Sequence, residues 1–198
     1  MAYAQHITSE EIEGLEFASF SGEIKVIQTE DAEFYKAMEY LNSQKMLGFD
    51  TETKPCFIAK VPRNKMAILQ LSGGDKAYIF RLQQLGVPQE LAKLLANKKI
   101  LKIGAAVHDD IKGLREYRDF EPGGFVDLQK MAGEYGIEEK SVRKMAAIIL
   151  NKRVSKSQQL SNWESAQLSE AQLKYAAIDA WICREMYNAL RKHKDTIC

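Results

Sequence analysis

Two acids, Asp50 and Glu52, stand one residue apart in the segment Phe49-Asp50-Thr51-Glu52-Thr53. In a β-strand, successive side chains alternate between the two faces, so these two carboxylates would project the same way. Adjacent carboxylates repel one another and are tolerated where a divalent cation neutralises them. Their hard oxygen ligands suit Mg²⁺ or Mn²⁺. An isolated Asp-x-Glu pair is more often a solvated strand end, but the apolar approach from Met46 favours a central strand, whose end is a usual place for a site.

Tyr175 and Asp179 form a second candidate pair, because a spacing of four places them on one face of a helix. Small residues between and after them, Ala176, Ala177 and Ala180, would let this helix approach another backbone closely. A carboxylate beside an apolar face is costly unless it is paired or bound to a metal. A tyrosine that anchors the helix through its hydroxyl, next to an acid at the edge of the buried stripe, would explain the same pattern. Both interpretations remain open at this point.

A third candidate acid is Asp109 or its neighbour Asp110. Two acids at a helix start complement the helix dipole, and this is the usual explanation for such a pair. Asp109 shares a helical face with Lys112, whereas Asp110 shares one with Leu114. Helical periodicity therefore does not choose between the two acids.

The elements that must position these residues alternate between strands and helices, which predicts a mixed α/β domain. Residues 21–198 are expected to form this domain, and residues 1–20 an extension or a loosely docked arm. The expected strands are 23–27, 46–50, 66–71, 77–80, 99–103 and 125–128, the third and fourth forming a hairpin about Gly73-Gly74-Asp75. The expected helices are one capped by Thr29, one beginning at Pro88, and those over 109–115, 141–150 and 169–192. A loop centred near residue 60 and a polar loop over 152–162 complete the pattern.

Composition gives no sign of a nucleic-acid partner. Lys and Arg number 28 against 27 Asp and Glu, a net charge of +1, so a binding site for an anion must be a local patch or a metal cluster. The three cysteines form no CxxC pair, which suits a reducing compartment. No apolar run is long enough for a membrane helix, and the N-terminus lacks the layout of a secretion signal. We therefore expect a cytoplasmic protein with no membrane association.

Four stretches, in this order and spacing, resemble the DEDD superfamily of 3′–5′ exonucleases, in the subgroup with a tyrosine in its last motif. The stretches are FDTETKP (49–55), MAILQLS (66–72), KIGAAVHDDIKGL (102–114) and LSNWESAQLSEAQLKYAAIDA (160–180). The sequence is similar to RNase D and to the Werner-type exonuclease domain over roughly residues 23–190. The resemblance implies an RNase H-like (DnaQ-like exonuclease) fold, with a mixed sheet of about five to six strands, an antiparallel portion and flanking helices.

The resemblance also implies a set of catalytic residues: Asp50, Glu52, Asp109, Tyr175 and Asp179. The four acids would hold two divalent cations, Mg²⁺ or Mn²⁺, and Tyr175 would orient or help to deprotonate the attacking water. Asp109 is preferred because Lys112 and Leu114 follow it at the family's spacing, and Asp110 is the alternative. The implied activity is stepwise hydrolysis of phosphodiester bonds from a single-stranded 3′ end of DNA or RNA, releasing nucleoside monophosphates. A non-catalytic nucleic-acid-binding or scaffold module on the same fold is the alternative, and the complete set of acids favours the enzyme.

Substrate contacts are expected from Thr51, Phe57, Arg153 and Lys156. Phe57 could stack on the terminal base or simply anchor its loop. Arg153 and Lys156 stand in the polar loop before Trp163 and could touch phosphates. The Arg143-Lys144 pair is interpreted as a solvated helix face, and Asp127 as a helix cap or a group that supports a metal ligand without binding the metal itself.

Overall fold

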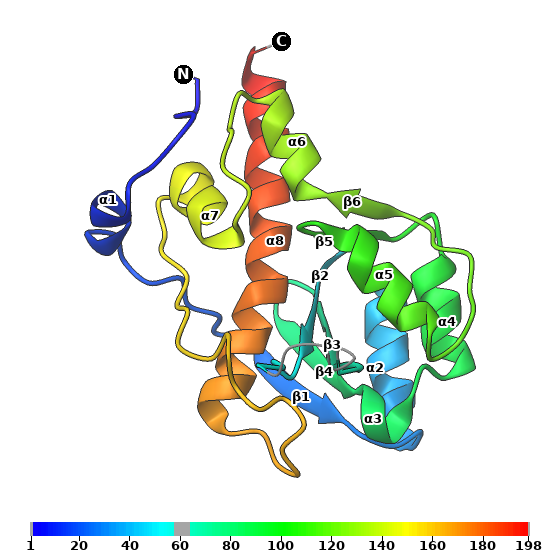
Figure 1. The fold of residues 1–198 in the computed structure, drawn as a ribbon. Helices are drawn as coiled ribbons and strands as arrows, with labels where there is room; N and C mark the ends of the chain where they lie inside the picture. Colours follow the sequence, from blue (N-terminus) through cyan, green and yellow to red (C-terminus); the bar gives the residue numbers. More distant parts are fainter. Residues whose placement is uncertain (1, 58–63, 198) are drawn as a thin grey trace.

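The computed structural model describes residues 2–57 and 64–197, the last four of these by their backbone. The described residues form a six-stranded sheet in the order β1-β4-β3-β2-β5-β6 (Figure 1). The strands are β1 (Glu23–Ile27), β2 (Met46–Thr53), β3 (Met66–Ser72), β4 (Lys76–Arg81), β5 (Leu101–Gly104) and β6 (Phe125–Asp127). Strands β2, β3 and β4 are antiparallel, whereas β1 runs parallel to β4, and β5 and β6 continue the sheet in parallel with β2. This confirms the predicted mixed sheet with an antiparallel portion.

Helices cover both faces of the sheet (Figure 1). One face packs on α2 (Ala32–Ser43), α3 (Leu82–Leu85), α4 (Gln89–Ala96) and α5 (Val107–Arg115), and their apolar residues join one core cluster with Phe49 and Leu69. The other face packs on α6 (Leu128–Glu134), α7 (Val142–Leu150) and the long helix α8 (Glu170–Ile197), whose cluster includes Ile103 and Met145. The short helix α1 (Ser9–Glu13) lies beside α7, outside these layers. Within the described part of the chain, no helix is both long and apolar enough to cross a lipid bilayer.

Helix α8 lies unusually close to the central strand β2. A Cβ atom added at Gly48 would stand 1.8 Å from the carbonyl oxygen of Ala180, so the absence of a side chain on β2 permits this approach. Ala176, Ala177 and Ala180 are fully buried, as their small size in the sequence suggested. The contact fixes the position of α8 along β2, and with it the position of any acid that α8 carries.

Some predicted boundaries are wrong, and the reason lies in the caps. Helix α2 is capped by Asp31, whose side chain accepts hydrogen bonds from the N–H groups of Glu33 and Phe34, while Thr29 donates to Asp31 at 2.6 Å. Pro88 precedes α4 as its N-cap rather than forming its first turn, and α8 continues past residue 192.

The prediction for Asp127 is confirmed, because this residue caps α6 by accepting from the N–H of Gln129 at 2.9 Å. The centre of the loop expected near residue 60 lies outside the described residues.

Candidate functional site

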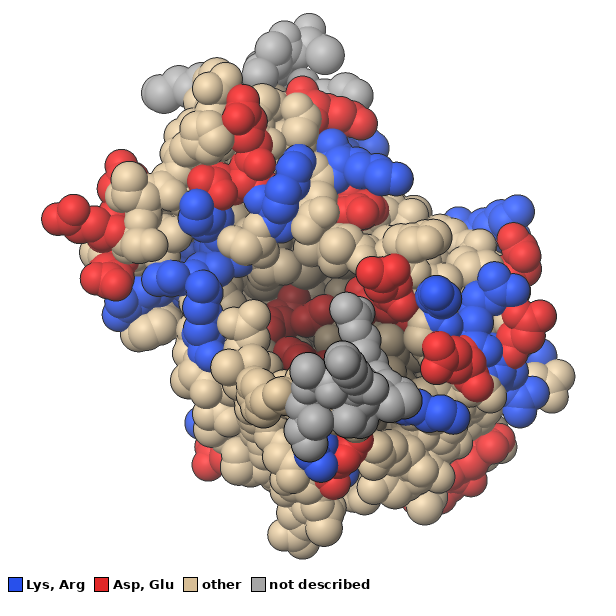
Figure 2. Space-filling view, viewed as in Figure 1, with Lys and Arg blue, Asp and Glu red and all other residues tan. Residues whose placement is uncertain are grey.

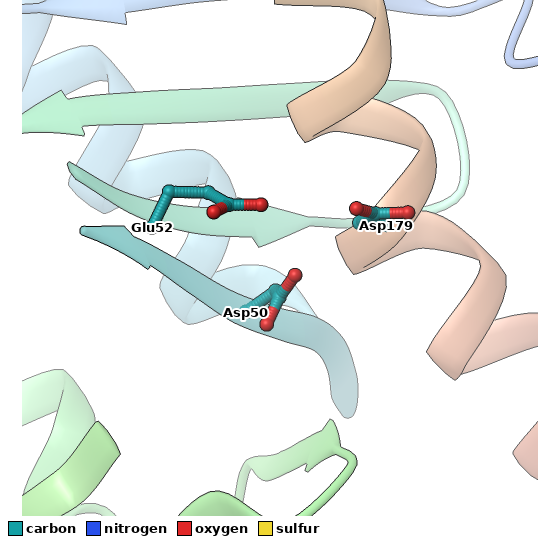
Figure 3. A group of neighbouring side chains, drawn as sticks. All are labelled: Asp50, Glu52 and Asp179. Atoms are coloured by element: carbon teal, nitrogen blue, oxygen red, sulfur yellow. The ribbon is translucent and has the colours of Figure 1, made fainter. Parts of the chain in front are cut away.

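Three carboxylates converge where the end of β2 meets α8. Asp50 and Glu52 project from β2, and Asp179 projects toward them from α8 (Figure 3). Each offers one oxygen, and these three oxygens lie within 4.8 Å of one another. The strand alternation and the close approach of α8 are therefore sufficient to assemble the cluster from residues far apart in the sequence.

Burial raises the pKa of every acid in this cluster, and the charges of neighbouring acids raise the pKa values of Asp50 and Glu52 further. Desolvation is the largest cause for each: with the charges of Asp179 and Asp110 it raises the pKa of Glu52 to about 8, and against the lowering effect of the Tyr175 hydrogen bond it raises that of Asp179 to about 7. The pKa of the half-buried Asp50 is also raised, by burial and then by the charges of Asp179, Glu52 and Asp110. A divalent cation would offset this repulsion, and the all-oxygen donor set fits a hard cation. The residues present are thus suited to hold a metal.

Tyr175 stands one helical turn before Asp179 and hydrogen-bonds to it. Its ring packs against the buried Trp163, with centroids 5.9 Å apart. Burial, followed by the charges of Asp179 and Glu52, raises the pKa of the Tyr175 hydroxyl far above its usual value. The phenol therefore stays protonated and acts as a hydrogen-bond donor.

The structure distinguishes between Asp109 and Asp110. Asp109 is exposed, whereas Asp110 is largely enclosed and accepts a hydrogen bond from the Thr51 hydroxyl. The charge of Asp110 acts on both Asp50 and Glu52, and burial raises its own pKa. The side chain next to the cluster is thus that of Asp110, the alternative, and not that of Asp109.

A cleft of about 300 Å³ opens above the cluster. Figure 2 shows its acidic floor as a red hollow, with lysines and arginines gathered on the rim beside α7. Its lining comprises Asp50, Thr51, Glu52, Ser141, Val142, Arg143, Val154, Ser155, Lys156, Gln159, Tyr175 and Asp179. One wall is therefore made by the start of α7 and by the segment that follows α7.

Arg143 and Lys156 are the cations on this wall, and no carboxylate pairs with either among the residues that the structure describes. Neighbouring lysines differ. Lys144 pairs with Glu139 at 2.9 Å, and Lys152 and Lys174 also have carboxylate partners. The two unpaired cations beside an acidic floor would suit a phosphate backbone whose scissile bond lies over the acids.

Of the other predicted substrate contacts, Thr51 lines the cleft, whereas Phe57 and Arg153 do not. Thr51 lines the cleft through the strand end that carries Asp50 and Glu52. Phe57 is 79% exposed and is not part of the lining. Arg153 also lies outside the lining, because its guanidinium packs 3.7 Å from the ring of Phe17.

Sequence reasoning missed Arg143. Arg143 and Lys144 are adjacent and look equivalent in the sequence, and the apolar positions of α7 do not decide which of them faces the cleft. The distinction arises from tertiary packing, in which Lys144 forms an ion pair with Glu139 and Arg143 lies on the cleft wall.

Residues 24–195 match the 3′–5′ exonuclease family, and the chain belongs to that family. Similar relatives are the exonuclease mut-7 homologue of Aedes aegypti (29% identity, 85% of this chain and 26% of the relative) and the bifunctional 3′–5′ exonuclease/ATP-dependent helicase WRN of Mus musculus (33%, 79% and 12%). Ribonuclease D of Haemophilus influenzae is also similar (30%, 65% and 32%). The chain thus spans less than a third of the length of each of these relatives.

Solved structures agree on the fold. The Nibbler EXO domain of Aedes aegypti superposes with a TM-score of 0.79 at 24% identity, covering 91% of this chain and 94% of that domain. Escherichia coli RNase D superposes with a TM-score of 0.76 at 20% identity, covering 86% of this chain and 45% of the enzyme. The predicted RNase H-like fold and the resemblance to the DEDD superfamily are confirmed.

Proposed function

We propose that this chain is a metal-dependent 3′–5′ exonuclease that hydrolyses phosphodiester bonds at nucleic-acid 3′ ends and releases nucleoside monophosphates. The observation that carries the proposal is the convergence of Asp50, Glu52 and Asp179 on the floor of a cleft, in a chain of the exonuclease family. The substrate would be a single-stranded end of DNA or RNA. A cytoplasmic location is part of the same proposal, because the three cysteines of the sequence form no CxxC pair, which suits a reducing compartment.

Asp50, Glu52 and Asp179 would hold two divalent cations, Mg²⁺ or Mn²⁺, with Asp110 taking the place first expected for Asp109. Bound there, the cations would activate water and neutralise charge on the phosphate. The high pKa of Glu52, about 8, means that this carboxyl must lose its proton when a cation enters.

Tyr175 acts as a donor rather than as a base, because its hydroxyl stays protonated. Its hydrogen bond to Asp179 orients that carboxylate, and the hydroxyl is placed to orient a water or a phosphate oxygen in the cleft. The position of Tyr175, one helical turn before Asp179, supports placing the chain in the tyrosine subgroup. Arg143 and Lys156 would bind the phosphates of the strand, and Thr51 would position Asp110.

Substitution of the acids tests the proposal. Asp50→Asn and Asp179→Asn keep the side-chain shape but remove the charge. Each should lower the rate at which a strand labelled at its 5′ end is shortened from its 3′ end by at least roughly a hundredfold. The assay compares single-stranded DNA, single-stranded RNA and recessed ends with Mg²⁺ or Mn²⁺. If the wild-type protein binds these strands but never shortens them, the non-catalytic module is correct instead.

Asp110→Asn and Asp109→Asn form a matched pair for the fourth acid. Both remove one negative charge from the same turn of α5, and Asp110 alone of the two faces the cluster. We expect Asp110→Asn to lower kcat at least roughly tenfold and Asp109→Asn to change it less than about twofold. If Asp109→Asn instead lowers kcat more than Asp110→Asn does, Asp109 is the ligand, as first expected.

A further inference from the structure

Residues 2–20, here called the N-terminal arm, precede the region that matches the exonuclease family, which begins at residue 24. The arm is anchored on the body of the protein. Ile12, in α1, is completely buried, and the ring of Phe20 packs on Trp181 of α8 with centroids 5.8 Å apart. Figure 1 shows α1 next to α7. The arm therefore has a defined place, and that place is beside the helix that begins the cleft wall.

The arm contacts the chain just before α7. The carbonyl of Gln5 accepts a hydrogen bond from the N–H of Glu138 at 3.0 Å. The His6 ring nitrogens lie 3.1 Å and 3.5 Å from the carboxylates of Glu138 and Glu139. This part of the arm therefore holds the segment that leads into α7.

The arm also contacts the chain just after α7, through Arg153. The N–H of Arg153 donates to the carbonyl of Glu16 at 2.9 Å, and the carbonyl of Arg153 accepts from the N–H of Ala18 at 2.9 Å. The guanidinium packs on the Phe17 ring at 3.7 Å and donates to the carbonyl of Glu13 at 3.0 Å. Arg153 is thus held by both its backbone and its side chain.

These two sets of contacts flank the basic wall of the cleft. Arg143 lies in the first turn of α7, and Lys156 follows Arg153 by three residues. Val154, which follows Arg153 and also lines the cleft, is buried in the same cluster as Ala18 of the arm. A change in the arm at Phe17 would therefore be transmitted to Lys156 through a short stretch of backbone.

We propose that the N-terminal arm is a clamp that positions Arg143 and Lys156, so that the enzyme grips phosphates beyond the terminal nucleotide. The proposal rests on the proposed exonuclease function. Phe17 is a positioning residue, because it acts through Arg153 and lies outside the cleft. A polynucleotide depends on this wall, whereas a substrate with a single phosphodiester occupies the acids alone.

The experiment compares Phe17→Ala with Tyr35→Ala in the full chain. Both rings are about half exposed, at 56% and 51%, and Tyr35 lies on α2, on the opposite face of the sheet. We expect Phe17→Ala to raise KM for a single-stranded oligonucleotide roughly three- to tenfold. Hydrolysis of thymidine 5′-monophosphate p-nitrophenyl ester should be unchanged, and Phe17→Tyr, which keeps the ring, should restore the oligonucleotide KM. Tyr35→Ala should leave both substrates unaffected.

Amide hydrogen exchange of residues 152–156 gives a readout that needs no activity. It should become faster in Phe17→Ala and remain at the wild-type rate in Tyr35→Ala. Unchanged exchange in Phe17→Ala would overturn the clamp, as would a parallel loss of activity on both substrates. If the wild-type protein hydrolyses neither substrate, the exonuclease proposal fails, and the exchange result still decides whether the arm orders this segment.

Discussion

At the scale of single residues, the defining property of the site is the electrostatic cost of its acids. Asp50, Glu52 and Asp179 are brought together in a place where burial already disfavours their charged forms. A carboxylate cluster of this kind destabilises the metal-free protein and favours cation binding for the same reason. Affinity for the cation and stability of the fold thus both depend on the protonation of these carboxyl groups.

This linkage predicts a dependence of stability on pH. The folded-state pKa values of Glu52 and Asp179, about 8 and about 7, lie above those of the unfolded chain, so unfolding releases protons between about pH 4 and 8. The metal-free protein should therefore lose stability as the pH rises, with Tm lower by roughly 5 °C at pH 7.5 than at pH 5.5. Lys102, whose pKa burial lowers to about 8, stays largely protonated across this interval.

Thermal unfolding in a chelating buffer measures the effect. Asp179→Asn should show a flatter dependence of Tm on pH, and Mn²⁺ should raise the wild-type Tm more at pH 7.5 than at pH 5.5. A wild-type Tm that rises with pH over this interval would contradict the assignment of raised pKa values to these acids.

Tyr175→Phe tests the role of the hydroxyl. The ring would still pack on Trp163, while the hydrogen bond to Asp179 would be lost. We expect kcat to fall roughly ten- to a hundredfold and KM to change little, because the hydroxyl orients groups at the reacting phosphate. Equal kcat values for Tyr175→Phe and wild type would remove the hydroxyl from the reaction.

The individual acids show how far sequence reasoning can reach. The strand period was enough to place Asp50 beside Glu52, and the helical period to stack Tyr175 on Asp179. The choice between Asp109 and Asp110 depends on how α5 is rotated against β2, and a single turn with acids at adjacent positions carries no such information. The Thr51 hydroxyl, which engages Asp110, is the contact that reveals the rotation.

At the scale of elements, the site depends on how closely α8 lies on β2. The order of strands and helices was predictable because hydrophobic periodicity changes clearly along the chain. The first residue of a helix was harder to predict. Thr29 and Asp31, for example, are both good caps, and the choice between them depends on local geometry.

Gly48→Ala tests the contact between these elements. Its Cβ would stand 1.8 Å from the Ala180 carbonyl, so α8 would have to move away from β2. We expect a loss of about 3 kcal/mol or more in the free energy of unfolding, or a failure to fold. Gly133→Ala is the matched control, because the nearest atom to its Cβ lies 4.0 Å away, and it should be neutral or slightly stabilising in denaturant titration.

At the scale of the whole molecule, the net charge of +1 conceals a local separation of charge. Three acids, Asp50, Glu52 and Asp179, lie on the floor of the cleft, and Arg143 and Lys156 lie on one wall. Composition averages over this separation, and for that reason gave no sign of a nucleic-acid partner. Lys156 was predicted as a phosphate contact, but its meeting with Arg143 could not be predicted, since it requires α7 and the segment after it to meet in space.

The dependence of oligonucleotide binding on salt measures this wall. Each phosphate contact with a single strand contributes a slope of about 0.7, so Arg143→Gln with Lys156→Gln should reduce the slope of log Kd against log salt concentration by about 1.4. Lys174→Gln is the control, because Lys174 already pairs with Glu170. An equal change in the slope for the control would show that these cations act through general charge alone.

The position of Asp179 on α8 has a consequence for synthesis of the protein. Asp50 and Glu52 leave the ribosome before α8, and the cluster of three acids is incomplete until α8 has emerged and docked against Gly48. A nascent chain would therefore carry the two strand acids without the third ligand. Any activity that needs all three acids would therefore appear only after α8 has emerged and docked, so the message and the ribosome would first be exposed to an inactive precursor.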